Sequence, residues 1–202
     1  NLVDIKDVLE MEYHLSYPYI FKEDDKIYLM PETEKNNRLE IYECIEFPNK
    51  WELYSTAFDG EKVVDAFFYN DEQKQKWLFV NKKANDNCSS DSELYIYKVD
   101  SLKMDKMEPH KNNPVIIDSR VARNGGPIFK YENKYYRPSQ ANIDGIYGAA
   151  LNINEINKLS IEEYNEETVV TVKPNFYKGL ISMHHLHQVN DLFVFDAAFK
   201  KK

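Results

Sequence analysis

Two carboxylates, Glu32 and Asp65, stand at predicted strand ends where acid–base chemistry could take place. Hydrolysis or transfer of a glycosyl group needs two carboxyl groups, one as proton donor and one as base or nucleophile. Glu32 and Asp65 are therefore the candidate catalytic pair. The alternative is structural: each carboxylate pairs with an arginine and holds neighbouring strands together, because buried carboxylates usually have a charged partner.

Three arginines, Arg120, Arg123 and Arg137, are candidates for binding an anion. A guanidinium group grips a phosphate, diphosphate or carboxylate with two parallel hydrogen bonds. Three arginines against Glu32 and Asp65 predict a site with excess positive charge and a preference for an anionic sugar derivative. Ion pairs with those carboxylates are an equally weighted alternative.

His184, His185 and His187 form the one histidine cluster of the sequence. In a strand, the period of two sends His185 and His187 to one face and His184 to the other. A metal site would need a further ligand such as His14 or Asp65, and the spacing alone is weak evidence. We therefore predict no metal and no cofactor.

These residues lie on a hairpin pattern that recurs four times. An apolar strand meets a polar turn, and a second strand rich in aromatic residues follows. Aligning Phe21, Phe68 and Phe129 gives a repeat of roughly 50 to 60 residues, in or somewhat above the range of one four-stranded propeller blade. The first strands of the four hairpins are Tyr17 to Phe21, Asp65 to Tyr69, Gly126 to Tyr131 and His184 to Gln188.

In a propeller the first strand of every blade lines the central channel. The repeat therefore predicts which residues lie together at a functional site on the axis. Besides Glu32 and Asp65, the polar residues on first strands and at second-strand ends are the predicted ligand-binding set: His14, Tyr17, Arg120, Arg123, Arg137, Gln140 and His184.

Several local patterns carry structural predictions. Adjacent glycines at Gly125 and Gly126 allow a positive φ or a close approach of another segment. Val115 to Ile117 reads as the outer strand of the second blade, and Asn154 to Glu163 as a turn or short helical insertion. Residues 1 to 12 read as a short helix or an extended lead-in.

Composition narrows the function classes. The chain of 202 residues has a net charge of −8 and a pI near 5.2, which argues against nucleic acid because phosphate binding needs clustered Lys and Arg. No apolar run approaches the ~20 residues of a membrane span. Cys44 and Cys88 lie in different repeats without a partner motif, which predicts a reducing, cytoplasmic compartment. The sequence starts at Asn1 rather than Met, so a segment upstream is left open.

Several motifs in order are more specific than any one of them: HLSYPYIF, YLMPET, NKWELY, VVDAFF, WLFV, ARNGGPIF, YYRPSQ, YGAALNINEI and MHHLHQ. In this order they resemble the five-bladed propeller domain at the N-terminus of plant glucosamine inositolphosphorylceramide transferases. The resemblance implies an all-β, five-bladed-type propeller in which residues 1–202 form a single domain, and this domain can be a fragment of a longer chain. About four blades are visible, and the first blade is missing or reduced to residues 1 to 12.

The resemblance also implies a function. It favours binding of a sugar or sugar phosphate in the axial pocket, with His184 as an axial hydrogen-bonding residue and a fused or associated transferase domain as partner. A glycosidase or transglycosidase that uses Glu32 and Asp65 is the second hypothesis. A non-catalytic scaffold for a neighbouring transferase domain is the third.

Overall fold

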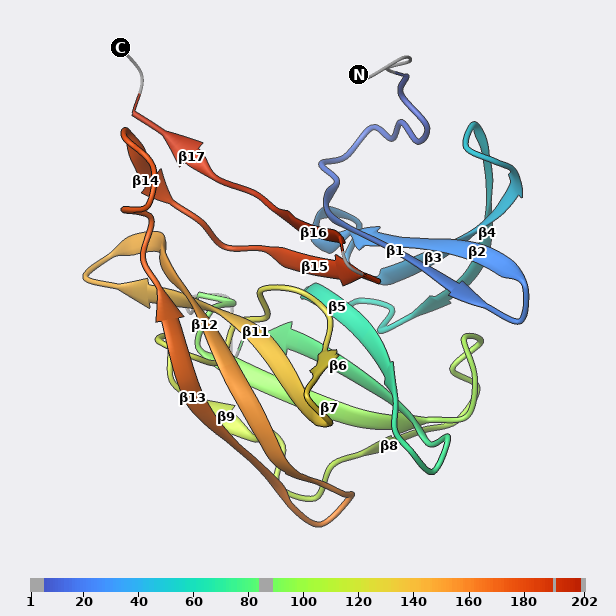
Figure 1. Ribbon diagram of the computed structural model, residues 1–202. Helices are drawn as coiled ribbons and strands as arrows, with labels where there is room; N and C mark the ends of the chain where they lie inside the picture. The colour runs from blue at the N-terminus through green and yellow to red at the C-terminus, as the bar shows by residue number, and fades with distance from the viewer. Residues whose placement is uncertain (1–5, 84–88, 191, 201–202) are drawn as a thin grey trace.

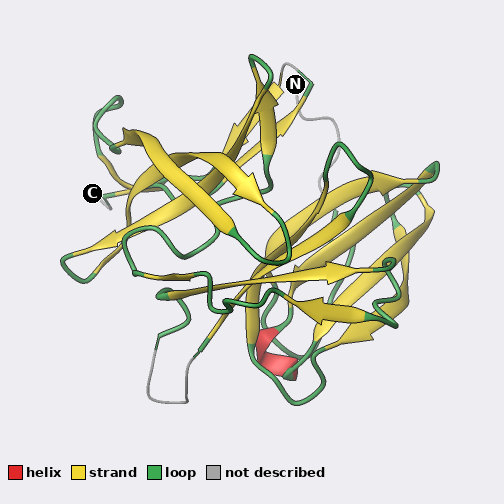
Figure 2. Cartoon of the chain, turned by 90° about the horizontal axis from the view of Figure 1, so that it is seen from below, coloured by secondary structure: helices red, strands yellow, loops and turns green. Residues whose placement is uncertain are grey.

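The protein is an all-β molecule with a propeller-type arrangement of sheets (Figure 1). The computed structural model describes residues 6–83, 89–190 and 192–200. Strands and loops make up nearly all of this part, and the one helical element is the 3-10 turn η1, Glu34–Asn36, red in Figure 2. No helix in the described ranges is long and apolar enough to cross a membrane.

The first sheet is a four-stranded antiparallel meander in the order β1-β2-β3-β4. Its two central strands each hold four consecutive buried residues, whereas the outer strands are mostly half-buried or exposed. The strand bounds are β1 Ser16–Glu23, β2 Lys26–Glu32, β3 Leu39–Glu46 and β4 Lys50–Ala57. The predicted first blade of the visible set is therefore present, and residues 6 to 12 precede it without regular secondary structure.

The second sheet follows the same order and has two short outer strands instead of one. Its bounds are β5 Val63–Asn70, β6 Lys76–Lys82, β7 Glu93–Val99, β8 Met107–Pro109 and β9 Ile116–Ile117. Strand β8 pairs with the end of β7, and β9 pairs with its beginning. The predicted outer strand at Val115 to Ile117 thus forms only half of that edge, because Pro109 ends the other half.

The third sheet is longer than the sequence pattern indicates. Its bounds are β10 Phe129–Tyr131, β11 Lys134–Ile143, β12 Ile146–Leu159 and β13 Tyr164–Val172. The prediction of a turn or helical insertion at Asn154 to Glu163 is wrong for its first part, because β12 continues to Leu159 and only the turn at Ser160 to Glu163 remains. Two register shifts in the pairing of β12 with β13 interrupt the alternation of apolar residues and hide the strand.

Two pairs of short strands complete the chain. Strand β14, Leu180–Ser182, pairs with β17, Ala198–Phe199, and β15, Leu186–Val189, pairs with β16, Leu192–Phe195. The β15–β16 hairpin is the predicted fourth repeat, and it lies between the first and third sheets near β1 (Figure 1). The described part thus holds three complete blades and two two-stranded pairs, and the sheets do not close into a ring.

The strand registers show that the blades repeat more closely than the alignment of aromatic residues indicates. Ser16 pairs with Glu32 in the first blade and Val64 with Asn81 in the second, and each pairing is followed by a bulge. In the third blade, the backbone N–H of Gln140 donates to the carbonyl of Arg123 at 2.8 Å. Equivalent second-strand positions are therefore occupied by Glu32, Asn81 and Gln140.

This register corrects one detail of the repeat. Counted from the paired positions, Phe21 corresponds to Tyr69 rather than to Phe68. A shift of one residue in a strand moves a side chain to the opposite face, so the correction matters for predicting which residues face the core.

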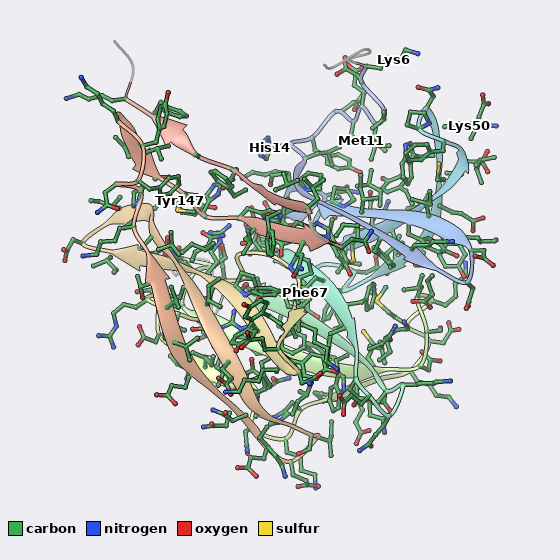
Figure 3. All side chains as sticks on the ribbon, viewed as in Figure 1. Lys6, Met11, His14, Lys50, Phe67 and Tyr147 are labelled. Carbon is green, nitrogen blue, oxygen red and sulfur yellow. The ribbon has the colours of Figure 1, made fainter. Side chains whose placement is uncertain are left out.

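The apolar core lies mainly between the first and second sheets. Phe67 and Phe79 are fully buried and their rings stack with centroids 5.0 Å apart, and Figure 3 shows Phe67 in the interior. Leu78, Ile41 and Met30 surround them with at most 1% exposure. Burial of this kind supplies the dominant favourable contribution to folding.

Gly125 and Gly126 have the role that their sequence indicates. Gly126 has φ of +136°, and a Cβ atom there would lie 1.8 Å from the carbonyl oxygen of Leu186 on β15. The N–H of Leu186 donates to the carbonyl of Gly125 at 2.7 Å. The two glycines therefore let the C-terminal hairpin pack directly on the backbone before β10.

Candidate functional site

A cavity of about 560 Å³ lies where the first strands of the blades meet the C-terminal hairpin. Residues from β1, β2, β5, β11, β12 and the hairpin contribute to it, although they are far apart in the sequence. The lining residues are Ser16, Tyr17, Pro18, Ile20, Glu32, Asp65, Arg123, Gln140, Tyr147, His184, His185, His187, Val189, Leu192, Val194, Phe195 and Asp196. The structure thus places Tyr17, Glu32, Asp65, Arg123, Gln140 and His184 of the predicted set at one cavity.

Arg123 and Asp65 form the charged centre of this cavity. Arg123 Nε donates to Asp65 Oδ2 at 2.6 Å, and the two side chains are only 13% and 4% exposed. A second nitrogen of Arg123, Nη2, lies 3.9 Å from Glu32 Oε2. Arg123 therefore bridges both carboxylates, which is the structural alternative considered for this pair.

Asp65 occupies its place through an unusual backbone conformation. Its φ is +49°, in the left-handed region that side chains other than glycine rarely adopt, and Tyr17 at the equivalent bulge has φ of +44°. The bulge turns both residues out of the regular pleat of their strands and towards the cavity. The two inner strands thus use the same device to present a side chain to the site.

Burial also changes the titration of Glu32, which lines the cavity. Burial, and next the charge of Asp65, raise the pKa of Glu32 to about 7, and Arg123 only partly opposes them. The Asp65 side chain thus raises the pKa of Glu32 through hydrogen bonding as well as through its charge.

Gln140 connects the carboxylates to the backbone of the third blade. Its Nε2 donates to Asp65 Oδ2 at 3.2 Å and to the carbonyl of Asn124 at 2.9 Å. Asn124 in turn donates from Nδ2 to the carbonyl of Asp65 at 2.9 Å. Gln140 is only 2% exposed, and its Oε1 has no hydrogen-bond partner among the described residues.

Tyr147 and His184 form the wall on the other side of Arg123. The Tyr147 ring lies under the guanidinium of Arg123 with 5.1 Å between the ring centroid and Cζ, and it meets the His184 ring edge-on at 4.9 Å. Tyr147 starts the third strand of its blade and lies below the C-terminal strands (Figure 3). This aromatic residue therefore links the charged centre to the histidines.

Asp196 fixes the orientation of His184. The carboxylate pairs with His184 Nδ1 and also accepts hydrogen bonds from the backbone N–H groups of His184 and His185, at 3.1 and 2.9 Å. Burial acts to raise the pKa of Asp196, but the hydrogen bonds and charge of His184 outweigh it and lower the pKa overall. Asp196 is thus held as an anion beside the histidine.

His185 and His187 extend the aromatic lining towards β1. The His185 ring meets the Tyr17 ring edge-on at 4.8 Å, and His187 lies 5.9 Å from the Tyr19 ring. Burial lowers the pKa of both histidines. Both side chains are therefore neutral aromatic walls at neutral pH.

Three predicted site residues are not among the lining residues. His14 is exposed on the segment before β1 (Figure 3). Arg120 is 72% exposed and pairs with Asp118 at 2.7 Å. Arg137 is fully buried, where its Nε donates to Glu166 Oε2 at 2.8 Å and its Nη1 to Asn124 Oδ1 at 3.0 Å.

These positions overturn the predicted excess of positive charge. Arg123 is the one Arg or Lys that lines the cavity within the described ranges, whereas Glu32, Asp65 and Asp196 all line it. Arg137 has a buried partner of its own, and Arg120 faces solvent. The physical basis for a preference for anionic sugars is therefore absent.

The His, Cys, Asp and Glu side chains of the described residues were compared with metal-binding and disulfide arrangements. In the ranges that the structure covers, no group of three or more His, Cys, Asp or Glu side chains has a metal-binding arrangement. Cys44 is a free, partly buried thiol. Cys88 lies outside the described residues.

Sequence reasoning missed Tyr147 and Asp196. Asp196 could have been found from the hairpin register, because Leu186 pairs with Phe195 and the next residue therefore lies opposite His185. No comparable sequence pattern pointed to Tyr147. It lies near the start of the third strand of its blade, and third strands are not expected to face the axis of a propeller.

The overall fold matches solved glycoside hydrolases of the β-propeller type. An endo-1,4-β-xylanase from Bacteroides thetaiotaomicron has a TM-score of 0.62 at 12% identity, with 92% of this chain and 66% of that chain covered. An exo-β-1,3-galactanase from Phanerochaete chrysosporium has a TM-score of 0.61 at 10% identity, with 94% and 44% covered. At such low identity the likeness concerns the fold alone.

Sequence comparison identifies the family. The N-terminal glucosamine inositolphosphorylceramide transferase 1 family matches residues 3–190. Glucosamine inositolphosphorylceramide transferase 1 of Oryza sativa subsp. japonica is 34% identical over 163 residues, and that of Arabidopsis thaliana is 31% identical over the same length. Each match covers 80% of this chain and 21% of the relative, so the chain spans about a fifth of the length of these proteins. The motif resemblance is thus confirmed, and the chain belongs to the family of glucosamine inositolphosphorylceramide transferase 1 N-terminal domains.

Proposed function

We propose that this chain is a carbohydrate-binding propeller domain that holds a sugar unit in the cavity around Arg123. The size of the cavity supports this proposal, because its volume of about 560 Å³ lies within the range of about 300–1,000 Å³ that is typical of small-ligand sites. The lining combines aromatic walls with a few converging polar groups, the composition that such sites use for contact area and orientation. A sugar ring has both apolar and polar faces and suits this combination.

The observation that carries the proposal is the convergence of Tyr147, Arg123 and Gln140 from different parts of the third blade. Tyr147 offers an aromatic face to a sugar ring, and Arg123 and Gln140 line the cavity beside it with polar side chains. An aromatic face next to a few fixed polar groups is the combination that small-ligand sites use for contact and orientation.

The proposed setting is a larger protein of glycan synthesis. The relatives are named as transferases and are about five times as long as the matched region, which supports a neighbouring or associated transferase domain as partner. In this proposal residues 1–202 form one propeller unit, related to five-bladed propellers, and the catalytic step belongs to the partner domain. The reducing, cytoplasmic compartment stays a prediction.

Paired-carboxylate catalysis by Glu32 and Asp65 is the second candidate. The raised pKa of Glu32 favours it, because a carboxyl that is still partly protonated near pH 7 can act as a general acid. The ion pair of Asp65 with Arg123, and the approach of the same arginine to Glu32, oppose it. Binding without hydrolysis is therefore our first choice.

Calorimetric titration with monosaccharides and short oligosaccharides tests the proposal. We expect Tyr147→Ala to weaken binding roughly tenfold or more, since removing a large aromatic contact commonly costs over 1 kcal/mol. Tyr131→Ala is the matched control, because Tyr131 is similarly exposed at a hairpin end outside the cavity. No binding by the unaltered protein, or equal loss in both variants, would refute sugar binding at this cavity, and release of free sugar during the titration would favour the glycosidase.

A further inference from the structure

The C-terminal hairpin, β15–β16, is attached to the third blade by backbone and apolar contacts. The N–H of Leu186 on β15 donates to the carbonyl of Gly125 at 2.7 Å. The ring of Phe193 on β16 meets the ring of Phe129 on β10 with centroids 6.4 Å apart. Neither contact involves a group that titrates, so this attachment does not change with pH.

The opposite side of the hairpin meets the first blade through two histidines (Figure 1). The ring of His185 meets the ring of Tyr17 on β1 edge-on at 4.8 Å, and the ring of His187 lies 5.9 Å from the ring of Tyr19. Among the described residues, no hydrogen bond or ion pair joins the hairpin to β1–β4. The seam formed by these four side chains therefore depends on the packing of uncharged rings.

Protonation of the histidines acts against this seam. Burial lowers the pKa of His187 and is the largest cause of the lowered pKa of His185, because an imidazolium loses hydration between the two elements. The charges of Asp196 and Asp65 favour protonation of His185, but burial outweighs them. The titratable groups that act on the two histidines are Tyr17 and Tyr19 on β1, Asp65 on β5, Asp196 after β16, and His184 together with the two histidines themselves.

The contact of His184 with the third blade responds to acid in the opposite sense. His184 pairs with Asp196, and its ring meets the ring of Tyr147 on β12 at 4.9 Å. Although burial acts to raise it, the hydrogen bonds and charge of His184 lower the pKa of Asp196 overall, so Asp196 stays an anion. A protonated His184 therefore keeps its partner and gains the attraction of the opposite charge.

We propose that the C-terminal hairpin is an acid-responsive flap, which separates from the first blade and stays attached to the third when His185 and His187 become protonated. Both histidines line the cavity, so separation of the seam widens access to it. The closed state holds the neutral imidazoles. Closure is therefore fully present well above pH 6.5, the ordinary pKa of histidine, and weakens as the pH falls below that value.

Distances between paired spin labels test the separation in the whole chain. Cys44 and Cys88 are first replaced by serine, and labels are attached to cysteines at exposed positions: Leu192 on the hairpin with Lys50 on the first blade, or Leu192 with Glu167 on the third. Between pH 7.5 and pH 5.5 we expect the ratio of long to short distances in the first pair to rise roughly threefold to tenfold for each histidine. The second pair should not change.

His185→Phe combined with His187→Phe is the decisive variant, because it keeps an aromatic ring at each position and cannot gain a proton. It should remove the pH dependence of the first pair and leave the distance at pH 7.5 unchanged. His14→Phe is the control, since His14 lies outside the cavity, and it should keep the full change. Glu32→Gln should also keep it, because the groups that shift the pKa of Glu32 lie outside the hairpin.

A pH series on the labelled protein with all its histidines gives a test that does not depend on the folding of the double variant. A midpoint between about pH 5 and pH 6.5 supports titration of histidines, and a midpoint below this range refutes it in favour of carboxyl groups. Unchanged distances refute the flap. Parallel lengthening in both label pairs, or a change that persists in the double variant, refutes it as well.

The result is independent of sugar binding, because the labels report on the hairpin without any ligand. Failure of this test leaves the proposed function standing.

Discussion

Glu32 shows how one strand position acquires different roles in successive blades. It occupies the register position that Asn81 and Gln140 hold in the other two complete blades. Asn81 is fully buried and binds backbone groups, with Nδ2 donating to the carbonyl of Ala122 at 2.9 Å. Only the first blade places a carboxyl group at this position, so the repeat adds one carboxylate to those of Asp65 and Asp196 at the cavity.

The raised pKa of Glu32 predicts a pH-dependent stability. Its pKa is about 7 in the folded protein against 4.5 in the unfolded chain, so the folded state holds the proton more tightly. Its contribution to stability is fully present below about pH 4.5 and is lost as the pH rises through about 7. Relative to the unaltered protein, Glu32→Gln should therefore gain roughly 1–3 kcal/mol of unfolding free energy between pH 5 and pH 8.

Urea denaturation at several pH values measures this difference. The exposed Glu167→Gln variant should keep a constant offset from the unaltered protein over the same range. A Glu32→Gln offset that is equally flat would show that Arg123 fully compensates the charge of Glu32.

At the scale of single residues, the position of each residue within the repeated hairpin was sufficient to predict that Glu32, Asp65, Arg123 and His184 line one cavity. The same reasoning failed for Arg137. Its partner Glu166 is 29 residues away on β13, which is separated from the strand of Arg137, β11, by β12. Sequence spacing does not reveal which of several acidic residues neutralises a buried arginine. For that reason the predicted excess of positive charge at the cavity was wrong, although most of the predicted residues do line it.

Strands and hairpins are the elements that hold the site in position. The repeated hairpin pattern predicted the first two strands of each blade, because alternation and turn residues are local signals. Strand β12 was only partly predicted, since its register shifts mask the alternation. The adjacent glycines indicated that another segment packs closely on Gly126. They did not indicate that this segment is the β15–β16 hairpin, because the contact joins parts of the chain that are distant in sequence.

Gly126→Ala should displace this hairpin. A methyl group would lie 1.8 Å from the Leu186 carbonyl oxygen, which neither backbone can accommodate without moving. We expect a loss of about 2–4 kcal/mol in unfolding free energy together with weaker ligand binding, since strained and overpacked sites lie at the upper end of single-residue effects.

Gly60→Ala is the control for the backbone conformation. Gly60 also has a positive φ, +84°, but an added Cβ would meet nothing within 4 Å. It should cost only the conformational penalty of about 1–2 kcal/mol and leave binding unchanged. Equal effects in the two variants would mean that hairpin contact adds nothing at Gly126.

The whole molecule is held together by an apolar core on one side and a polar network on the other. The core joins the first and second sheets. The network runs from Asn81, whose Oδ1 accepts from the N–H of Asn124 at 2.8 Å, through Asn124 to Arg137 and Glu166 on the third sheet. The third sheet is thereby attached to the second through buried hydrogen bonds.

Arg137→Met should destabilise the entire molecule. Removing one partner leaves Glu166 buried without a counter-ion, which typically costs about 3–5 kcal/mol. The double variant Arg137→Met, Glu166→Leu should recover much of this loss, because an apolar pair can replace a buried ion pair at little cost. Urea denaturation measures both effects.

Arg120→Met provides the comparison, because Arg120 lies in solvent and should change stability little. A double variant that is no more stable than Arg137→Met would show that the hydrogen bonds of Arg137 to Asn124 and the Val121 carbonyl, rather than its charge, attach the third sheet.

The bulges at Tyr17 and Asp65 have a consequence for the evolution of such domains. Each bulged residue stands outside the alternation that assigns its neighbours to core or solvent. A substitution there can alter what the cavity recognises while the packing of the strand is preserved. Specificity can therefore drift or be re-engineered blade by blade, provided that a change at Asp65 is combined with one at Arg123, because either change alone leaves a buried charge without its partner.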